Sequence, residues 1–332
     1  MGYMRSRPSG IVRAVLVCGL AVVAASSWAA VALSAPPVRL SIVTGGTGGV
    51  YFPMGGGLAQ LISKYLPDTQ ATAEVTSASV DNMRLIGAKR ADIAFTLADT
   101  AFDAFTGQAT FQGTPIPIRT LTPLYNNFNH LVTIEGTGVA SVTDLRGKRV
   151  SVGSPGSGTE VTAVRILRAA GLDPDRDIRK ERLGVQESVD AIKDRKIDAF
   201  FWSGGLPTSA VLDLATTPGL RIRLVPLDTT IAELQKTYGN LYFKAVILKE
   251  IYPGAPANAA TVGVANLLVV HQDFNGDLAY QITKLIYERR SELAQVHKEA
   301  ANITLTGVVG RSPVPFHPGA IRYFKEKGVQ GF

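Results

Sequence analysis

The chain has 332 residues, a formal net charge of +7 and a hydrophobic content of 46%, enough for one large or two medium domains around a hydrophobic core. Lysines and arginines are scattered, and no basic run is interleaved with aromatic residues, which argues against nucleic acid as a partner. The single cysteine excludes an internal disulfide and a thiolate metal site.

The first 32 residues have the pattern of a secretory signal peptide. Three arginines precede the apolar run "AVLVCGLAVVAA" (14–25), which is too short to span a bilayer comfortably, and the small residues of "AVALSA" follow. Cleavage after Ala32 or Ala35 would remove the cysteine and lower the net charge to +4. A membrane anchor and a buried helix are the alternatives. We expect an exported, soluble protein of the periplasm.

Predicted strands and helices alternate along the rest of the chain, which is typical of an α/β fold. From residue 39 the strand "RLSIV" leads through a glycine loop into a helix, and strand, helix, strand and helix follow as far as residue 105. The same order recurs from residue 148 to residue 215, with "SPGSG" as its loop. Two similar lobes would bring the two glycine loops to opposite walls of one ligand cleft, because ligands of open α/β sheets lie at such strand ends.

The chain is expected to pass between the lobes twice, within 126–138 and within 221–230. This assigns residues 38–128 and 226–332 to lobe 1 and residues 129–225 to lobe 2. The apolar run 261–270 predicts a buried strand, and the strong helical period of 276–293 predicts one helix. Both elements would complete lobe 1.

The motifs of common enzymes are missing from the glycine-rich segments. "TGGTGGVYFPMGGG" (44–57) matches neither the dinucleotide fingerprint nor the P-loop, and "GSPGSGT" (153–159) lacks the spacing of a nucleophile elbow. The four histidines are far apart, and segment 173–184 lacks the glycine and the bidentate glutamate of a calcium loop. We expect a protein that is not an enzyme and that uses no metal and no cofactor.

Two interpretations of the glycine loops remain open. Glycine tolerates positive φ and permits tight turns and close helix packing. Glycine also lets backbone N–H groups approach a ligand, and the helix that follows each loop carries about half a positive charge at its N-terminus. In the second interpretation two opposed loops could hold an anion without an arginine.

Five motifs together resemble the TAXI family, the extracytoplasmic solute receptors of tripartite ATP-independent periplasmic (TRAP) transporters. They are "VTGGTGGVYFPMGGGLAQLI", "TSASVDN", "GSPGSGTE", "DAFFWSGGLP" and "PFHPGAIRYFKEKG", and they cover the chain after residue 42 in order. The resemblance implies a two-lobed, type II periplasmic binding-protein fold with the ligand between the lobes. It also implies a membrane permease as partner, driven by an ion gradient.

The resemblance also suggests the residues that contact the ligand, mostly in the loops after predicted strands. Two departures from the family pattern, Ala78-Ser79 and Leu97-Ala98-Asp99, affect one wall of the expected cleft. The predicted ligand-binding residues are Thr47, Gly48, Gly49, Val50, Tyr51, Ser79, Asn82, Thr96, Ser154, Ser157, Gly158, Thr159, Trp202, Gly204 and Gly205.

Several of these residues and their neighbours have structural alternatives. Ser157 begins the capping-box pattern S-x-x-E, so its hydroxyl could serve the helix, the ligand, or both. Asp99 is expected to be a helix N-cap. Tyr51 and Trp202 suit either a cleft wall or the core, and the helical arginines at 84 and 165 are expected to be solvated or paired.

The sequence therefore predicts a periplasmic receptor that captures a small carboxylate-bearing solute by lobe closure and delivers it to a TRAP-type permease. The resemblance suggests a glutamate-like amino acid or a dicarboxylate as the ligand, and a monomer is the expected state. A binding protein of an ATP-driven importer, a sensor component and a secreted enzyme are the alternatives.

Overall fold

The computed structural model describes residues 1–4 and 36–332, and residues Val38–Phe332 form one compact unit. Apart from residues 1–4, the predicted signal peptide and its cleavage sites lie outside the described residues. In the described part of the chain no helix is both long enough and apolar enough to cross a membrane.

The compact unit is built from ten strands and the helices α2 to α11, apart from short 3-10 turns. The strands are β1 (Val38–Val43), β2 (Thr69–Glu74), β3 (Ile93–Leu97), β4 (Ile118–Ile134), β5 (Arg149–Ser151), β6 (Arg179–Glu181), β7 (Ala199–Gly204), β8 (Ile222–Leu224), β9 (Tyr242–Ile247) and β10 (Ala259–His271). The helices are α2 (Tyr51–Tyr65), α3 (Ser79–Gly87), α4 (Ala98–Thr106), α5 (Gly158–Ala169), α6 (Val185–Lys193), α7 (Ser209–Ala215), α8 (Ile231–Tyr238), α9 (Gly276–Glu288), α10 (Arg290–Val296) and α11 (Pro318–Glu326).

The sheet has the same strand order on both sides of its two long strands. Its order is β2-β1-β3-β10-β4-β7-β5-β6, with β8 on β4 and β9 on β10. On one side β1 is parallel to β2 and β3, and β3 is antiparallel to β10. On the other side β5 is parallel to β6 and β7, and β7 is antiparallel to β4. The duplicated order that the sequence predicts is confirmed, and so is the two-lobed, type II periplasmic binding-protein fold.

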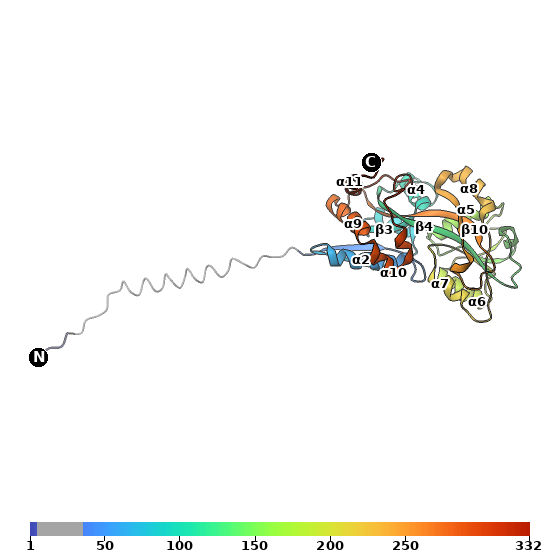
Figure 1. Ribbon diagram of the computed structural model, residues 1–332, viewed down its shortest axis with the longest axis horizontal. Helices are drawn as coiled ribbons and strands as arrows, with labels where there is room; N and C mark the ends of the chain where they lie inside the picture. The colour runs from blue at the N-terminus through green and yellow to red at the C-terminus, as the bar shows by residue number, and fades with distance from the viewer. Residues whose placement is uncertain (5–35) are drawn as a thin grey trace. The chain divides into compact units, whose positions relative to one another are not determined.

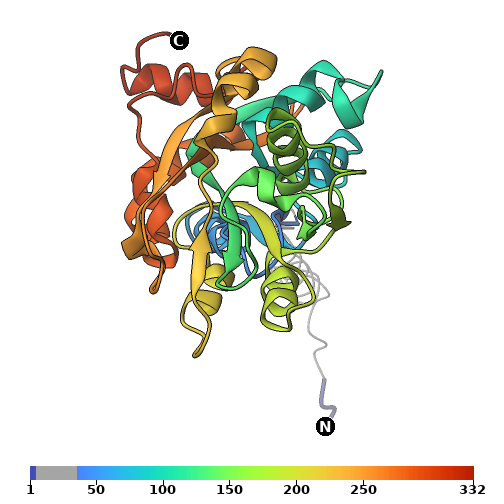
Figure 2. The same ribbon diagram turned by 90° about the vertical axis from the view of Figure 1, so that its right-hand side faces the viewer.

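The two long strands join the two halves of the unit. Figure 1 shows β4 and β10 running from the part that carries α2, α9 and α11 to the part that carries α5 to α8, and Figure 2 shows the same arrangement turned by 90°. The strands pair antiparallel from Ile118 with His271 to Phe128 with Gly263. Both are buried along nearly their whole length, so period-2 alternation is missing from their sequences and only the apolar run 261–270 predicts one of them.

Three predicted elements differ from the observed ones. β2 and β6 begin earlier than the segments 72–76 and 181–185 that the sequence suggests. The single helix predicted over 276–293 is wrong, because it breaks at Arg289 into α9 and α10. The apolar face of α9 is buried as expected, and it packs against α11, whose Tyr323 and Phe324 are buried.

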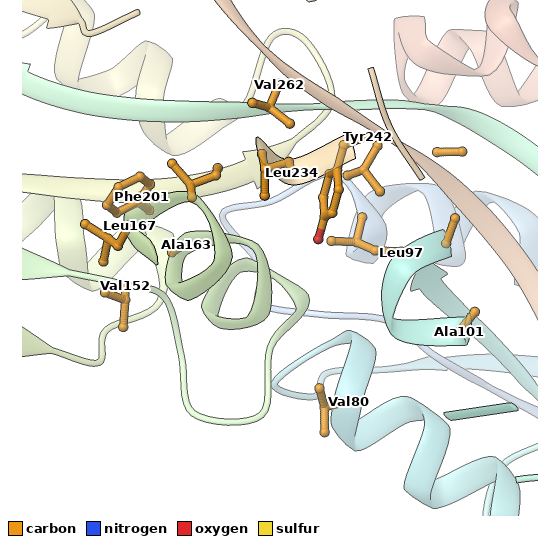
Figure 3. Close-up of a cluster of buried hydrophobic side chains, with 14 of the residues drawn as sticks. Val80, Leu97, Ala101, Val152, Ala163, Leu167, Phe201, Leu234, Tyr242 and Val262 are labelled. Carbon is orange, nitrogen blue, oxygen red and sulfur yellow. The ribbon is translucent and has the colours of Figure 1, made fainter. Parts of the chain in front are cut away.

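The hydrophobic core supports both halves and the junction between them. One buried cluster contains Ile42, Met54 and Ile62 from β1 and α2 together with residues of α9 and α11. Another joins residues of both halves, and Figure 3 shows Leu97 and Ala101 of the first half in the same cluster as Leu167 and Phe201 of the second half.

The position at which the chain returns to the first lobe is open to a different interpretation. The predicted boundaries, 38–128 with 226–332 and 129–225, stay a prediction. Ile247, Tyr252 and Ala259 belong to the same buried cluster as Val189 and Phe200 of the second half. We therefore propose that the second lobe extends to β10 and that β4 and β10 are the two crossings.

Candidate functional site

A cavity of about 250 Å³ lies where the two glycine loops meet. Its walls come from both halves of the sheet, at the ends of β1, β2, β5, β6 and β7 and at the starts of α2, α3, α5 and α6. Strand β4 forms part of the wall between the loops through Tyr125 and Asn127. The two glycine loops predicted to face each other do line one cavity.

Twelve of the fifteen predicted ligand-binding residues line this cavity. They are Thr47, Gly48, Gly49, Val50, Tyr51, Ser79, Ser154, Ser157, Gly158, Thr159, Trp202 and Gly204. Asn82, Thr96 and Gly205 are not among the lining residues. Contact of the twelve with a ligand stays a prediction.

The three residues outside the cavity wall have structural roles. The amide nitrogen of Asn82 donates to the carbonyls of Thr44 (2.7 Å) and Phe95 (2.8 Å), which ties the end of β1 to β3. Thr96 is fully buried within β3, where it pairs with β10. Gly205 lies so close to Glu299 that a Cβ would be 2.8 Å from its Cγ atom.

Several lining residues were not predicted from the sequence. Those in the loops follow β1, β2, β5 and β6, so a systematic reading of every strand end in both halves would have found most of them. Tyr125 and Asn127 gave no such signal, because β4 is buried on both faces. The additional lining residues are Gly45, Gly46, Val75, Thr76, Ser77, Ala78, Leu97, Tyr125, Asn127, Gly153, Gly184, Val185, Gln186, Glu187 and Ser203.

Tyr51 and Trp202, which suited either a cleft wall or the core, belong both to the cavity wall and to the hydrophobic packing. Tyr51 lines the cavity while its hydroxyl donates to the buried amide oxygen of Asn266, and burial raises the pKa of Tyr51 well above its ordinary value. Trp202 lines the cavity from the other half, and its indole N–H donates to the hydroxyl of Thr208 at 2.8 Å. Both rings are therefore held in place by hydrogen bonds outside the cavity.

Tyr125 has a buried hydroxyl without a hydrogen-bond partner in the described part of the chain. The residue is fully buried and lines the cavity, and burial raises its pKa well above the ordinary value of a phenol. A buried polar group that the protein leaves unpaired is normally satisfied by water or by a ligand. The Tyr125 hydroxyl is therefore a candidate ligand contact.

The electrostatics of the cavity depend on backbone groups. Among the described residues that line it there is no lysine, arginine or histidine, and Glu187 is the one charged side chain. Helices α2, α3, α5 and α6 all begin at lining residues, namely Tyr51, Ser79, Gly158 and Val185. Each helix N-terminus carries roughly half a positive charge, so the cavity favours a negatively charged group.

The amides at these helix starts are available for a ligand. Within the described residues the backbone N–H groups of Tyr51, Ser79, Gly158 and Thr159 donate to no protein atom. The hydroxyl of Ser157 accepts from the amide of Glu160 at 3.0 Å, which confirms the helix-capping alternative, while its contact with a ligand stays a prediction. The reciprocal half of the capping box is absent, because the Glu160 carboxylate accepts from Gly156 instead.

Each glycine loop also contacts a helix start in the opposite half. The carbonyl of Gly156, a residue with a φ of +79°, accepts from the amides of Val80 (3.1 Å) and Asp81 (3.2 Å) at the start of α3. The carbonyl of Gly48 accepts from the amide of Ala210 in α7 at 3.3 Å. The two halves are thus in direct contact on both sides of the cavity.

The prediction that Asp99 is a helix N-cap is wrong. Helix α4 starts at Ala98, one residue earlier, and has no side-chain cap. The Asp99 carboxylate instead accepts from the hydroxyl of Tyr242 at 2.6 Å and lies 3.6 Å from the guanidinium of Arg165. Asp99 therefore belongs to a buried ionic cluster between the halves.

The two helical arginines differ in their surroundings, and neither lines the cavity. Arg165 is buried and paired: it donates to Asp103 at 2.5 Å and to the hydroxyl of Tyr242 at 3.2 Å. Burial raises the pKa of Asp103, against the opposing effect of the arginine. Arg84 is 56% exposed and lies 3.8 Å from Asp81.

Solved structures with the same kind of fold share little sequence with this chain. A protein from Bordetella bronchiseptica RB50 is 18% identical over 87% of this chain and 89% of its own, with a TM-score of 0.51. The periplasmic aliphatic sulphonate binding protein SsuA from Escherichia coli is 15% identical over 89% of this chain and 94% of its own, with a TM-score of 0.45.

The two-lobed fold, with a cavity between its glycine loops, is the fold of solute-binding proteins of the periplasmic type. Within that class, the chain belongs to the NMT1-like family, whose model matches residues 42–328.

Proposed function

We propose that this protein is the periplasmic receptor of a TRAP transporter of the TAXI type and that it binds a small carboxylate-bearing solute. The lobes close around the solute and release it to a membrane permease. Export with removal of the signal peptide and a monomeric receptor belong to the same proposal. The observation that carries it is a cavity without basic side chains at which four helices begin.

A carboxylate suits this cavity because its oxygens accept hydrogen bonds from backbone amides. The free amides of Tyr51 and Ser79 come from one half, and those of Gly158 and Thr159 come from the other. Removal of water on lobe closure strengthens each of these hydrogen bonds, since the surrounding dielectric constant falls. An affinity in the micromolar range, roughly −8 kcal/mol, would be ordinary for such a site.

The charge of Glu187 favours an amino acid over a dicarboxylate. Its carboxylate is exposed at the cavity wall and forms no ion pair within the described residues. A second carboxylate near Glu187 would be repelled, whereas an ammonium group would be attracted. A glutamate-like amino acid could place its ammonium group there and a carboxylate at the helix starts.

The test is calorimetric titration of the ligand-free protein with glutamate, glutamine and succinate, after mass spectrometry of the solute that co-purifies with it. We expect a bound carboxylate and weaker binding of a solute whose carboxylate has been amidated. A co-purifying solute without a carboxylate would contradict the proposal that the ligand carries one. Copurification with an ATP-driven importer in place of a TRAP permease would contradict the transporter type and leave the binding site intact.

A further inference from the structure

A second cavity, of about 480 Å³, lies on the opposite face of strand β4. Asn126 lines it, whereas its neighbours Tyr125 and Asn127 line the first cavity, because successive side chains of a strand point to opposite faces. None of its lining residues belongs to the first cavity. Its walls come from β4, from β9 with the turn before it, from the segment 310–313 ahead of α11, and from Ala98 of α4 and Ala265 of β10.

The second cavity contains a cation that the protein does not neutralise. One terminal nitrogen of Arg311 donates to the amide oxygen of Asn126 at 2.8 Å. Within the described residues no carboxylate lies within ion-pair distance of Arg311, and the remaining donors of its guanidinium make no hydrogen bond. Burial lowers the pKa of this guanidinium, although a guanidinium keeps its charge at neutral pH.

Arg165 shows how the same protein treats another arginine between its halves. That guanidinium is paired with two carboxylates, Asp99 and Asp103, and with a tyrosine hydroxyl. A partly buried charge without such partners is costly unless a mobile counterion or a ligand supplies the opposite charge. The guanidinium of Arg311 therefore has the charge and the free donors that a bound anion needs.

The lining of the cavity narrows the class of anion. The planar guanidinium binds a carboxylate through two parallel hydrogen bonds. Leu241 and Phe243 add apolar surface, and Asn240 adds a polar side chain at the same cavity. We propose that this cavity is a second binding site, which takes a small organic carboxylate with a short apolar part at Arg311.

The position of the site predicts an effect on the first cavity. Strand β4 carries Asn126 in the second cavity and Tyr125 and Asn127 in the first. A carboxylate held at Asn126 and Arg311 would restrain this part of the strand. By linkage, any change in solute affinity caused by the carboxylate equals the change in carboxylate affinity caused by the solute.

The test uses butyrate as the probe and its neutral isostere butyramide as the control, in nuclear magnetic resonance titrations of isotope-labelled protein. Butyrate should shift the side-chain signals of Arg311 and Asn126 saturably, and butyramide should not. The indole signal of Trp202 reports the first cavity. Shifts confined to that indole, or equal shifts with butyramide, would overturn the proposal.

Variants locate the site independently of the proposed function. Arg311→Gln should weaken butyrate binding at least tenfold, and Arg311→Lys should weaken it less because the charge remains. Arg322→Gln is the matched control, since Arg322 is 54% exposed and already paired with Asp277, and it should change the affinity less than twofold. Unchanged binding in correctly folded Arg311→Gln would contradict the site, whatever solute the first cavity binds.

Discussion

At the scale of single residues, Gly49 and Gly158 of the two loops are glycines because their surroundings leave no room for a side chain. Neither Gly49 nor Gly158 has a positive φ. A Cβ on Gly49 would lie 2.9 Å from the Trp202 ring, and one on Gly158 would lie 2.6 Å from the hydroxyl of Ser79. The sequence predicted that these positions face a cavity, but the neighbours that exclude a side chain come from the opposite half and could not be read from local sequence.

Gly49→Val and Gly158→Val should therefore impair closure more than folding. Each new side chain collides with the opposite half, and that collision disappears when the halves separate. We expect solute affinity to fall more than tenfold, with the melting temperature changed by no more than about 2 °C. Gly56→Val is the matched control, because Gly56 lies outside the cavity wall and its Cβ would meet nothing within 4 Å. Calorimetry measures the solute affinity of all three variants, and thermal unfolding measures their stability. Lost stability with retained affinity in the Gly49 and Gly158 variants would contradict the prediction that these glycines are required for closure.

The unpartnered hydroxyl of Tyr125 predicts changes of opposite sign in Tyr125→Phe. Without a ligand the wild-type protein carries an unsatisfied buried group, so the variant should be more stable by about 1 kcal/mol. If the hydroxyl bonds to the solute, the variant should bind it more weakly by about 0.5 to 1.5 kcal/mol. Urea unfolding of the ligand-free protein and calorimetric titration measure the two effects. Tighter or unchanged solute binding would exclude Tyr125 as a ligand contact.

At the scale of elements, helices α4 and α5 are joined by the buried cluster of Asp99, Asp103 and Arg165. The ring of Tyr238 in α8 lies 4.1 Å from the same guanidinium. Sequence reasoning placed Arg165 on a helix behind a glycine loop and allowed it a partner. It could not identify the partner, because the first residues of α4 and α5 are 60 positions apart in the chain and the helices meet only through the packing of the two halves.

Arg165→Met should destabilise the fold strongly, because two carboxylates would remain buried without a counterion. Loss of one partner of a buried ion pair costs about 3 to 5 kcal/mol. Arg84→Met is the control: its side chain is 56% exposed, and the change should stay within about 0.5 kcal/mol. The free energy of unfolding in urea is the measurement. Equal effects of the two substitutions on the free energy of unfolding would show that the buried cluster stabilises the fold no more than a surface ion pair does.

At the scale of the whole molecule, the sequence predicted the repeat and not the way its copies are joined. The two copies were visible because their strands, glycine loops and helices follow in the same order. The continuous sheet depends on β4 and β10, whose length and pairing come from contacts between residues more than 100 positions apart. His130 of β4, which pairs with Trp202 of β7, is buried within the second half.

His130 should make the stability of the molecule depend on pH. Its Nδ1 lies 2.8 Å from the carbonyl of Phe128, and its Nε2 lies 3.0 Å from the hydroxyl of Tyr252. Because a carbonyl can only accept, the neutral imidazole carries its proton on Nδ1, and Nε2 accepts from the hydroxyl of Tyr252, which itself accepts from the amide of Thr208. Burial lowers the pKa of His130 to about 4.

In the unfolded chain the same imidazole has a pKa of about 6.5. Between pH 6.5 and pH 4 the unfolded state therefore binds more protons than the folded state, and the free energy of unfolding falls as the pH falls. The contribution is fully present above pH 6.5, and about 3 kcal/mol is lost by pH 4. His130→Gln should be less stable than the wild type at pH 7 and should lose less stability between pH 7 and pH 4. Urea unfolding of both proteins across this range is the measurement, and parallel pH profiles would show that the protonation of His130 does not limit the stability of the fold.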